Sequence, residues 1–498
     1  MSAAKRKRSS HLDNVNPVQE ALERFRPLLS SEEWQALLAE LDQPLYPALR
    51  LNTLKAGPED LNVWAERYGW RLKPVPFCSS GWWVISARYP VSQTIEHRLG
   101  FYYIQEAASM LPVELFNFVP GERPLILDMA ASPGGKTTHL VARTRDRGLV
   151  IANDPSRERV TALRLVLQTW GAINIAVTAF PGERWGQWYP EMFDAILQDA
   201  PCSMQSLRPS EGHPMRPIGA REQTMLVRRQ AALLVSALSA LKTGGQLVYA
   251  TCTLTPEEDE GVLDEVLRAH PGVFEVMPIA ERLPVPAPAL QATPQRVFDP
   301  QVRHALRLWP HRLHTAGFFV ARLRKIKPLQ WHNETPPAAR RGLHGEVITS
   351  TEVQRLAEAW LAAYGFDFRP VLEDQNLVLI GDKEGIEAVP RAFIAIFNQL
   401  PVVSLGLRMA EWTPEGWIPS HEWVARFGAH FQNGVLTLPG GLEAAWIRGE
   451  DVPLPAIKEI PSTRVVIVRD VQGRTLGRGR VTRERLKNML PRRIVLPW

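Results

Sequence analysis

Two of the three cysteines in this chain follow apolar segments that have the length of buried strands. Cys202 closes the segment Asp199-Ala200-Pro201-Cys202, and Cys252 comes shortly after residues 246–250. A thiolate is a soft nucleophile that can add to an electron-poor ring carbon, such as C6 of a pyrimidine. That addition makes C5 nucleophilic enough to take a methyl group from a sulfonium donor, while Asp199 hydrogen-bonds the ring as charge develops. A second thiol could then assist release of the first.

Each cysteine taken alone has a plainer interpretation. A free cysteine is most often a small apolar residue that fills the core. The place of Cys202 and Cys252 at two strand ends, with an acid beside one of them, favours chemistry over packing for this pair. Cys78 stands beside Trp82 and Trp83, and we expect it to be a packing residue.

A run of small residues follows the apolar segment 125–129 and ends in Gly-Gly-Lys-Thr. Small residues let the backbone approach a ligand closely, and the N-terminus of the next helix offers free N–H groups. A nucleoside-triphosphate loop would need glycine at position 130 and an N–H at position 133, where Ala130 and Pro133 stand. A purely structural turn is another alternative. The expected cofactor-binding residues here are Ala130, Ala131, Ser132, Pro133, Gly134, Gly135 and Lys136.

The next apolar segment, residues 149–153, leads directly to Asp154. An acid in that place, some 20 residues beyond a small-residue turn, can hydrogen-bond both hydroxyl groups of a ribose. Alternatively, Asp154 only caps the following helix. With the turn, it indicates a bound nucleoside whose tail lies at the small residues.

Five apolar segments alternate with helical patterns through the middle of the chain. Residues 160–170 and 234–241 carry apolar side chains at helical spacing, and Gly244-Gly245 is expected to stop the second helix. Thr255 and Glu258 have the spacing of a capping box. Strands alternating with helices predict a parallel sheet, whose ligands lie beyond the carboxyl ends of the strands. The expected strands are Leu125–Met129, Leu149–Asn153, Asn174–Val177, Phe193–Leu197 and Gln246–Ala250.

Smaller units flank this middle part. Residues 17–41 have helical spacing, and residues 49–86 predict a small α/β unit. Residues 326–346 are rich in proline and polar side chains, as in a linker. The last hundred residues are rich in strands, with a hairpin turning at Gln472-Gly473 and then a short helix.

The net charge of +6 is unevenly distributed. From Arg464 to Trp498 there are nine Arg and one Lys against Asp470 and Glu484, which gives +8 for this tail and −2 for the rest. A basic region at one end is typical of a phosphate-backbone partner, although an arginine-rich surface strand is often only solvated. The same alternatives hold for the basic run 5–8 at the other end.

Composition excludes several classes of protein. Apolar residues make up 45% and charged residues 22% of the chain, as in ordinary globular proteins. Three cysteines in 498 residues exclude a disulfide scaffold and favour a reducing, cytoplasmic compartment. No apolar stretch is long enough to span a membrane, and no secretory signal is evident at the N-terminus.

The motifs together resemble the Fmu/Sun family of RNA cytosine-C5 methyltransferases over residues 45–325. They are FYYIQEAASMLP, LDMAASPGGKTTHL, IANDPSRERVTAL, FDAILQDAPCS, GGQLVYATCTLTPEEDEGVL and GFFVARLRK. The paired DAPCS and TCTL are specific to RNA, as opposed to DNA, enzymes. Outside the core, LRLNTLK, GWWVIS and RERLKNMLPRR resemble the bacterial branch that modifies small-subunit rRNA.

The resemblance implies a function for each matching residue. Cys252 matches the nucleophile, Cys202 the cysteine that aids product release, and Asp199 the acid that engages the target base. Ala130 to Lys136 match the S-adenosyl-L-methionine loop. Asp154 matches the acid on the ribose, and Arg159 stands where the family has an arginine in the following helix.

The resemblance also implies a fold and a domain organisation. The fold class is α/β: a Rossmann-like class I S-adenosylmethionine-dependent methyltransferase core with a small N-terminal α/β RNA-binding domain and C-terminal mixed and PUA-like β-rich domains. The expected borders are 1–100 for the N-terminal RNA-binding domain, 101–325 for the catalytic domain, 326–346 for a linker, 347–395 for a small α/β domain and 396–498 for a PUA-like RNA-binding domain.

Three positions depart from the family pattern. Pro181 replaces the acid that touches the adenine after the third strand, Met204 replaces a glycine after Cys202, and Ala316 replaces the acid before Gly-Phe-Phe. Losing a charged hydrogen bond at position 181 weakens cofactor binding by about 1–3 kcal/mol.

The leading hypothesis is an enzyme that transfers a methyl group from S-adenosyl-L-methionine to C5 of a cytosine in small-subunit rRNA, as a monomer and without a metal. The alternatives are a non-catalytic RNA-binding or ribosome-assembly factor with the same fold and a tRNA cytosine-C5 methyltransferase. The loop 207–222, with Arg208, Arg216 and Arg221, is either a flap over the target base or an ordinary solvated loop.

Overall fold

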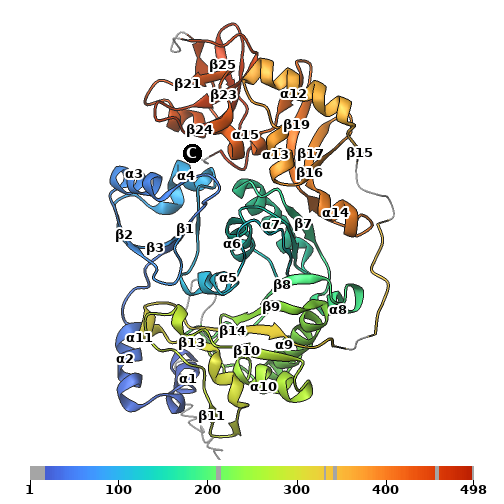
Figure 1. Cartoon of the computed structure of the whole chain (residues 1–498). Helices are drawn as coiled ribbons and strands as arrows, with labels where there is room; N and C mark the ends of the chain where they lie inside the picture. The colour runs from blue at the N-terminus through green and yellow to red at the C-terminus, as the bar shows by residue number, and fades with distance from the viewer. Residues whose placement is uncertain (1–16, 209–214, 330–331, 340–344, 455–458, 496–498) are drawn as a thin grey trace, which may run out of the picture.

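The computed structural model describes residues 17–208, 215–329, 332–339, 345–454 and 459–495. Four of its sheets have four or more strands, and helices cover the largest of them (Figure 1). The basic run 5–8 lies outside the described residues, as do residues 209–214 of the expected flap and parts of the expected linker.

The N-terminal part contains two separate pieces. Helices α1 (Pro17–Glu23) and α2 (Ser31–Leu41) and the segment between them pack against Leu254 and Trp309 of the central part. The contacting side chains are Phe25, Trp34 and Leu37. A four-stranded sheet follows in the order β2-β3-β1-β4, with helix α3 (Pro58–Tyr68) covering it. Its strands are β1 (Ala48–Leu51), β2 (Trp70–Pro74), β3 (Gly81–Ala87) and β4 (Tyr102–Ile104). The last strand of this sheet therefore lies beyond residue 100.

The central sheet has the order β10-β14-β9-β8-β5-β6-β7-β18. Strands β5 to β9 pair in parallel, with helices between them along the chain, so the prediction of a Rossmann-like α/β core is confirmed. Its parallel strands are β5 (Leu125–Asp128), β6 (Leu149–Asn153), β7 (Ile175–Thr178), β8 (Phe193–Asp199) and β9 (Leu241–Thr251); the main helices are α6 (Gly135–Arg143), α7 (Arg157–Trp170), α9 (Ala220–Ala240) and α10 (Glu260–Ala269).

Antiparallel strands extend this sheet at both edges. On one side β14 (Phe318–Lys325) pairs with β9, β10 (Phe274–Met277) and β13 (Leu306–Leu308). On the other side β18 (Ser404–Leu405) comes from the C-terminal part and pairs with β7. Because α14 (Arg391–Ile396) also packs Phe393 into the central core, the C-terminal part is joined to the catalytic sheet.

The C-terminal part contains two five-stranded sheets. The first, β15-β16-β17-β19-β20, carries helix α12 (Ser350–Tyr364); the second has the order β21-β23-β24-β25-β22 and packs against α15 (His421–Phe427). Their strands are β15 (Glu346–Val347), β16 (Leu377–Gly381), β17 (Gly385–Pro390), β19 (Leu407–Thr413), β20 (Gly416–Pro419), β21 (Val435–Thr437), β22 (Val452–Pro453), β23 (Val465–Arg469), β24 (Thr475–Val481) and β25 (Arg485–Asn488). The domain borders given above stay predictions, although the first sheet spans residue 395.

Two local predictions are wrong. The segment after the hairpin is strand β25 rather than a short helix, because Leu486 is buried between exposed Arg485 and Lys487, which is the alternation of a strand. The helix expected to stop at Gly244-Gly245 ends at Ala240, and the glycines lie within β9. The hairpin at Gln472-Gly473 is confirmed by the pairing of β23 with β24. Among the described residues, no helix is both long and apolar enough to cross a membrane.

Candidate active site

Cys202 and Cys252 meet at the carboxyl edge of the central sheet. Strands β8 and β9 are parallel neighbours with Asp199 paired to Ala250, so the segments that follow them leave the sheet side by side. The two Sγ atoms lie 3.2 Å apart, although the cysteines are 50 residues apart in the sequence. The side chains of the next residues also meet, because Ser203 Oγ lies 3.1 Å from Thr253 Oγ1. The expected convergence of the two cysteines is confirmed.

The surroundings of the two sulfur atoms favour the thiolate form at Cys252. The hydrogen bond from Cys202 lowers the pKa of the Cys252 thiol, and nearby Lys136 lowers it further against burial and Asp199. The same hydrogen bond, with burial and the charge of Glu258, raises the pKa of Cys202 well above its usual value. These directions favour Cys252 as the thiolate of the pair, with Cys202 as a neutral hydrogen-bond donor to it.

A lysine and an acid stand beside this pair. Lys136, in the first turn of α6, donates to Asp199 Oδ2 over 2.7 Å and to Ser109 Oγ over 3.3 Å. Its ammonium nitrogen lies 5.6 Å from the centre of the Phe318 ring. Asp199 ends β8, Phe318 begins β14, and Lys136 lies at the start of α6. The ends of two strands and one helix therefore surround the space next to the cysteines.

The small-residue turn between β5 and α6 has the form that a polar ligand requires. Gly134 has φ of 116°, a conformation that favours glycine, and it stands directly before α6. Thr137 donates to Asp128 Oδ2 over 2.7 Å, while burial raises the pKa of Asp128 to about 7. Ser132 Oγ and Asp128 Oδ1 are buried, and neither has a hydrogen-bond partner among the described residues. Two such orphaned polar atoms fit a ligand with polar groups of its own.

Asp154 and Arg159 hold this turn from the side. Asp154 is fully buried; it accepts the Ser156 N–H over 3.0 Å, and it lies 3.4 Å from both Arg159 and the Ser132 N–H. Arg159 also donates to the carbonyl of Ser132 over 2.8 Å. The helix itself is capped by Ser156, so Asp154 is not its cap. Both side chains therefore shape the edge where a ribose is expected.

The departures from the family pattern have different structural outcomes. Met204 keeps a positive φ of 59°, the conformation that a glycine would adopt freely. The backbone N–H of Ala316 donates to Glu106 over 3.0 Å, so a carboxylate from another segment lies at this position. Pro181 directly precedes a short helical turn, Gly182–Arg184.

Three polar residues of the site were missed by the sequence analysis. Ser109 and Glu106 lie in the motif that precedes the core, and their proximity to Lys136 and Ala316 depends on the tertiary fold. Glu258 was expected to cap a helix with Thr255; this prediction is wrong, because its carboxylate binds Ser203 instead and the helix begins at Glu260. The spacing of residues carries no signal for such long-range pairs.

The expected flap begins at a fixed point. Arg208 donates to the Glu40 carboxylate over 2.6 Å and to the Glu40 carbonyl over 2.9 Å, so the end of α2 holds the start of the loop. Arg216 pairs with Glu222 at the other end of the segment.

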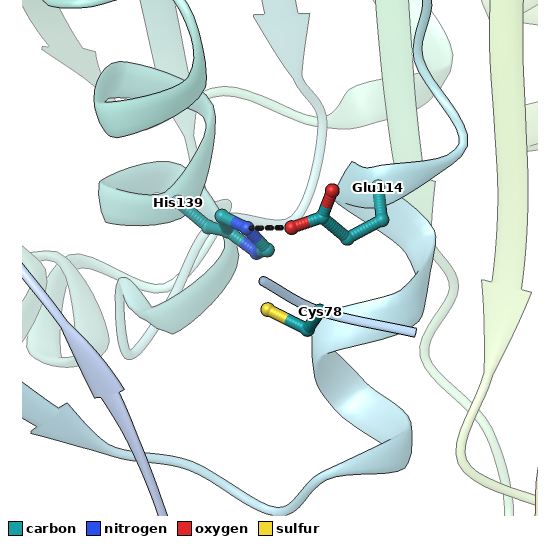
Figure 2. Close-up of side chains that lie close together, drawn as sticks. All are labelled: Cys78, Glu114 and His139. Carbon is teal, nitrogen blue, oxygen red and sulfur yellow. Dashed lines mark hydrogen bonds and ion pairs between the residues drawn. The ribbon is translucent and has the colours of Figure 1, made fainter. Parts of the chain in front are cut away.

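Cys78 belongs to a separate buried cluster on the N-terminal side of the core. Its sulfur lies near Glu114 and His139, and the potential ligand atoms of the three are within 4.8 Å of one another (Figure 2). His139 is hydrogen-bonded to Glu114 over 3.1 Å, and Arg143 pairs with the other carboxylate oxygen. Burial raises the pKa of Cys78 to about 12 and lowers that of His139 to about 4. Cys78 is buried among the apolar side chains of the core, as expected for a packing residue.

Most of the C-terminal arginines are paired within the protein. Six of the nine donate to acids or backbone carbonyls, so much of the local charge is already neutralised. They are Arg469 with the carbonyls of residues 428 and 431, Arg474 with Glu96 and Asp470, Arg478 with Glu411, Arg480 with Glu415, Arg485 with Asp451, and Arg493 with Glu422. Exposed Arg483 and Lys487 lie on either side of Arg485.

The parallel sheet, the turn before α6 and the cysteine pair define a class I methyltransferase of the RNA cytosine-C5 type, which uses S-adenosyl-L-methionine. Comparison with known proteins agrees. The family model described as 16S rRNA methyltransferase RsmB/F matches residues 115–324, and the N-terminal domain of 16S rRNA methyltransferase RsmF matches residues 19–107.

Full-length relatives and a solved structure extend the similarity. Ribosomal RNA small subunit methyltransferase F of Aeromonas salmonicida is 34% identical over 472 residues, covering 94% of each chain. The protein of that name from Escherichia coli O9:H4 is 32% identical over 470 residues, again with 94% of each covered. A methyltransferase homolog from Pyrococcus horikoshii is 30% identical, covers 62% of this chain and 99% of its own, and has a TM-score of 0.51. The chain belongs to the RsmF family of 16S rRNA methyltransferases, and the alternatives of a non-catalytic factor and a tRNA enzyme are set aside.

Proposed function

We propose that this protein methylates C5 of a cytosine in 16S rRNA through a covalent bond between Cys252 and C6 of the base. The observation that carries the proposal is the distance of 3.2 Å between the Cys202 and Cys252 sulfur atoms, beside the Lys136–Asp199 pair. No other pair of cysteines in the chain offers this arrangement, because Cys78 lies in the separate buried cluster.

The Cys252 thiolate adds to C6, and the π electrons of the C5–C6 bond move to C5. C5 takes the methyl group of the sulfonium donor, whose carbon–sulfur bond breaks and leaves a neutral thioether. Asp199 accepts a hydrogen bond from the exocyclic amine, and a proton from the Lys136–Asp199 pair passes to N3 as negative charge enters the ring. N3 returns this proton to the pair when the ring is restored. The C5 proton then leaves, its bonding electrons restore the double bond, and the sulfur–C6 bond breaks to return the thiolate.

Cys202 takes part in the final step. While Cys252 is a thiolate, its hydrogen bond keeps Cys202 protonated. Once Cys252 is bonded to carbon, that hydrogen bond no longer raises the Cys202 pKa. Cys202 can then ionise and accept the C5 proton, which allows release of the product.

The residues expected to hold the cofactor line one edge of the sheet. S-adenosyl-L-methionine, when bound, supplies the methyl group. The segment from Ala130 to Lys136 and the carboxylate of Asp199 would surround its tail, and Asp154 would hold the ribose. Arg159 fixes the turn beside Asp154. The orphaned Ser132 Oγ and Asp128 Oδ1 are available to hydrogen-bond it.

The flanking parts serve the RNA. The N-terminal and C-terminal sheets grip the RNA backbone while a single base is turned out toward the cysteines, because specific RNA readers act on splayed bases. The protein acts as a monomer in the cytoplasm, where its three thiols stay reduced.

A trapping experiment tests the nucleophile and the release step together. With unmodified 16S rRNA and S-adenosyl-L-methionine at mildly alkaline pH, Cys202→Ala is expected to accumulate a covalent protein–RNA adduct that survives denaturing electrophoresis. Cys202→Ala with Cys252→Ala should give none, and Cys78→Ala should resemble the unaltered protein. An adduct that persists without Cys252 would show that the nucleophile is another residue.

A further inference from the structure

Glu258 occupies a place that neither the cysteine motifs nor the cofactor loop explains. Its side chain has no solvent exposure, and its carboxylate points at the loop after Cys202. Oε2 accepts the Ser203 N–H over 2.9 Å and the Gln230 side-chain amide over 2.9 Å, while Oε1 accepts the Ser203 hydroxyl. Three donors around one buried carboxylate hold the residue next to Cys202 in a single place.

The same carboxylate sets the direction of a chain of hydroxyl groups that reaches Thr253, the residue after Cys252. A carboxylate only accepts, so the Ser203 hydroxyl hydrogen points to Glu258, and Thr253 must donate to Ser203 across 3.1 Å. Thr253 in turn accepts the Thr255 N–H over 3.2 Å. The residues that follow the two cysteines are thereby linked in one defined orientation.

The loop after Cys202 needs such a restraint. Met204 holds φ of 59° and Leu207 holds φ of 62°, and a side chain in this conformation costs roughly 1–2 kcal/mol. A glycine would adopt the conformation of Met204 without this cost. Without a tether, the segment therefore tends to leave the geometry that brings Cys202 to 3.2 Å from Cys252.

We propose that Glu258 is a positioning residue that clamps Ser203 and so keeps Cys202 in place for the release step. This inference rests on the proposed function, because it assigns Glu258 to the step that Cys202 performs.

The test separates release from adduct formation. Glu258→Gln removes the charge and one acceptor, and we expect kcat for rRNA methylation to fall at least about tenfold. The fraction of enzyme trapped as the covalent Cys252–RNA adduct should rise, as with Cys202→Ala. A residue with a merely structural role would lower turnover and adduct together. Adding Met204→Gly should restore part of the turnover, because glycine relieves the strained conformation.

Glu257→Gln is the matched control. Glu257 directly precedes Glu258, is half exposed and pairs with Arg24 on the surface. The adduct fraction and kcat of the Glu257→Gln variant should therefore match those of the unaltered protein. If Glu258→Gln does not fold, Ser203→Ala replaces it as the test variant, because it removes one hydrogen bond to Glu258. A raised adduct fraction in Ser203→Ala supports the proposal, and an unchanged fraction overturns it. If Cys202→Ala traps adduct but folded Glu258→Gln behaves like Glu257→Gln, only this inference fails. If Cys202→Ala itself traps none, the proposed function fails.

Discussion

The carboxyl edge of the central sheet and the C-terminal hairpin both concentrate charged or nucleophilic side chains, but they use them differently. At the sheet edge, Lys136, Asp199 and the two cysteines come from separate segments and meet around a space, while Ser132 Oγ and Asp128 Oδ1 keep unused hydrogen-bonding capacity. In the hairpin region, most arginines are already bound to acids or carbonyls of the same chain.

The difference shows that residue type alone does not identify a binding surface. A parallel sheet forces the ends of its strands together, so functional residues there are exposed to a ligand by the topology. An arginine on a strand pairs with whichever acid the fold brings near it. Arg474, for example, binds Glu96 of the N-terminal part and ties the two ends of the molecule together.

The largest expected effect concerns the sheet edge. Cys252→Ala should reduce methyl transfer from labelled S-adenosyl-L-methionine to 16S rRNA by about 10⁴-fold or more, because the covalent step is lost. The thermal unfolding midpoint should stay close to that of the unaltered protein. Residual activity above one hundredth of normal would assign the attack to a different group.

The next effect concerns the joint between the C-terminal hairpin and the N-terminal part. Glu96 is fully buried and pairs with Arg67 and Arg474. Glu96→Gln leaves these guanidinium groups partly uncompensated and should weaken the hairpin by roughly 3 kcal/mol, measured as the opening free energy of β23 and β24 amides in hydrogen exchange. Asp451→Asn, which breaks the exposed pair with Arg485, should cost about 1 kcal/mol or less. Equal effects would mean that burial does not distinguish the two pairs.

A pH measurement sharpens the description of the cysteine pair. The reactive form is the thiolate, so alkylation of Cys252 by iodoacetamide rises as pH increases through its pKa. Because the hydrogen bond from Cys202 lowers that pKa, Cys202→Ala should move the midpoint to higher pH, and Lys136→Met should do so as well. Mass spectrometry of the Cys252 peptide gives the rate. A midpoint that moves to lower pH would reverse the assigned direction of the hydrogen bond.

The smallest effect concerns the exposed cations of the C-terminal sheet. Changing exposed Arg483 and Lys487 to Gln should lower the slope of log binding constant against log salt for 16S rRNA by about 1–2. Arg478→Gln is the control, because Arg478 is buried and paired with Glu411; it should lower stability and leave the slope unchanged. The reverse pattern would place the RNA contact on the buried, paired Arg478.

The sequence predicted the central fold well because local patterns encode it. Apolar segments alternating with helices gave the five parallel strands, and the meeting of Cys202 with Cys252 followed from the ends of two neighbouring strands. Prediction failed where a side chain's partner lies far away in the chain. Glu258 has the spacing of a capping residue, yet it binds Ser203, 55 residues earlier.

Strand β25 shows the same limit at the level of secondary structure. Its segment carries residues that suit a helix, but pairing with β24 and burial of Leu486 make it a strand. Residue types and spacing by themselves determined the α/β core and indicated the methyl-transfer chemistry, and the resemblance of the motifs indicated the family. Only the tertiary structure decided which acids neutralise the C-terminal arginines and which carboxylate holds the Cys202 loop, because these contacts depend on how distant segments pack and not on their local sequence.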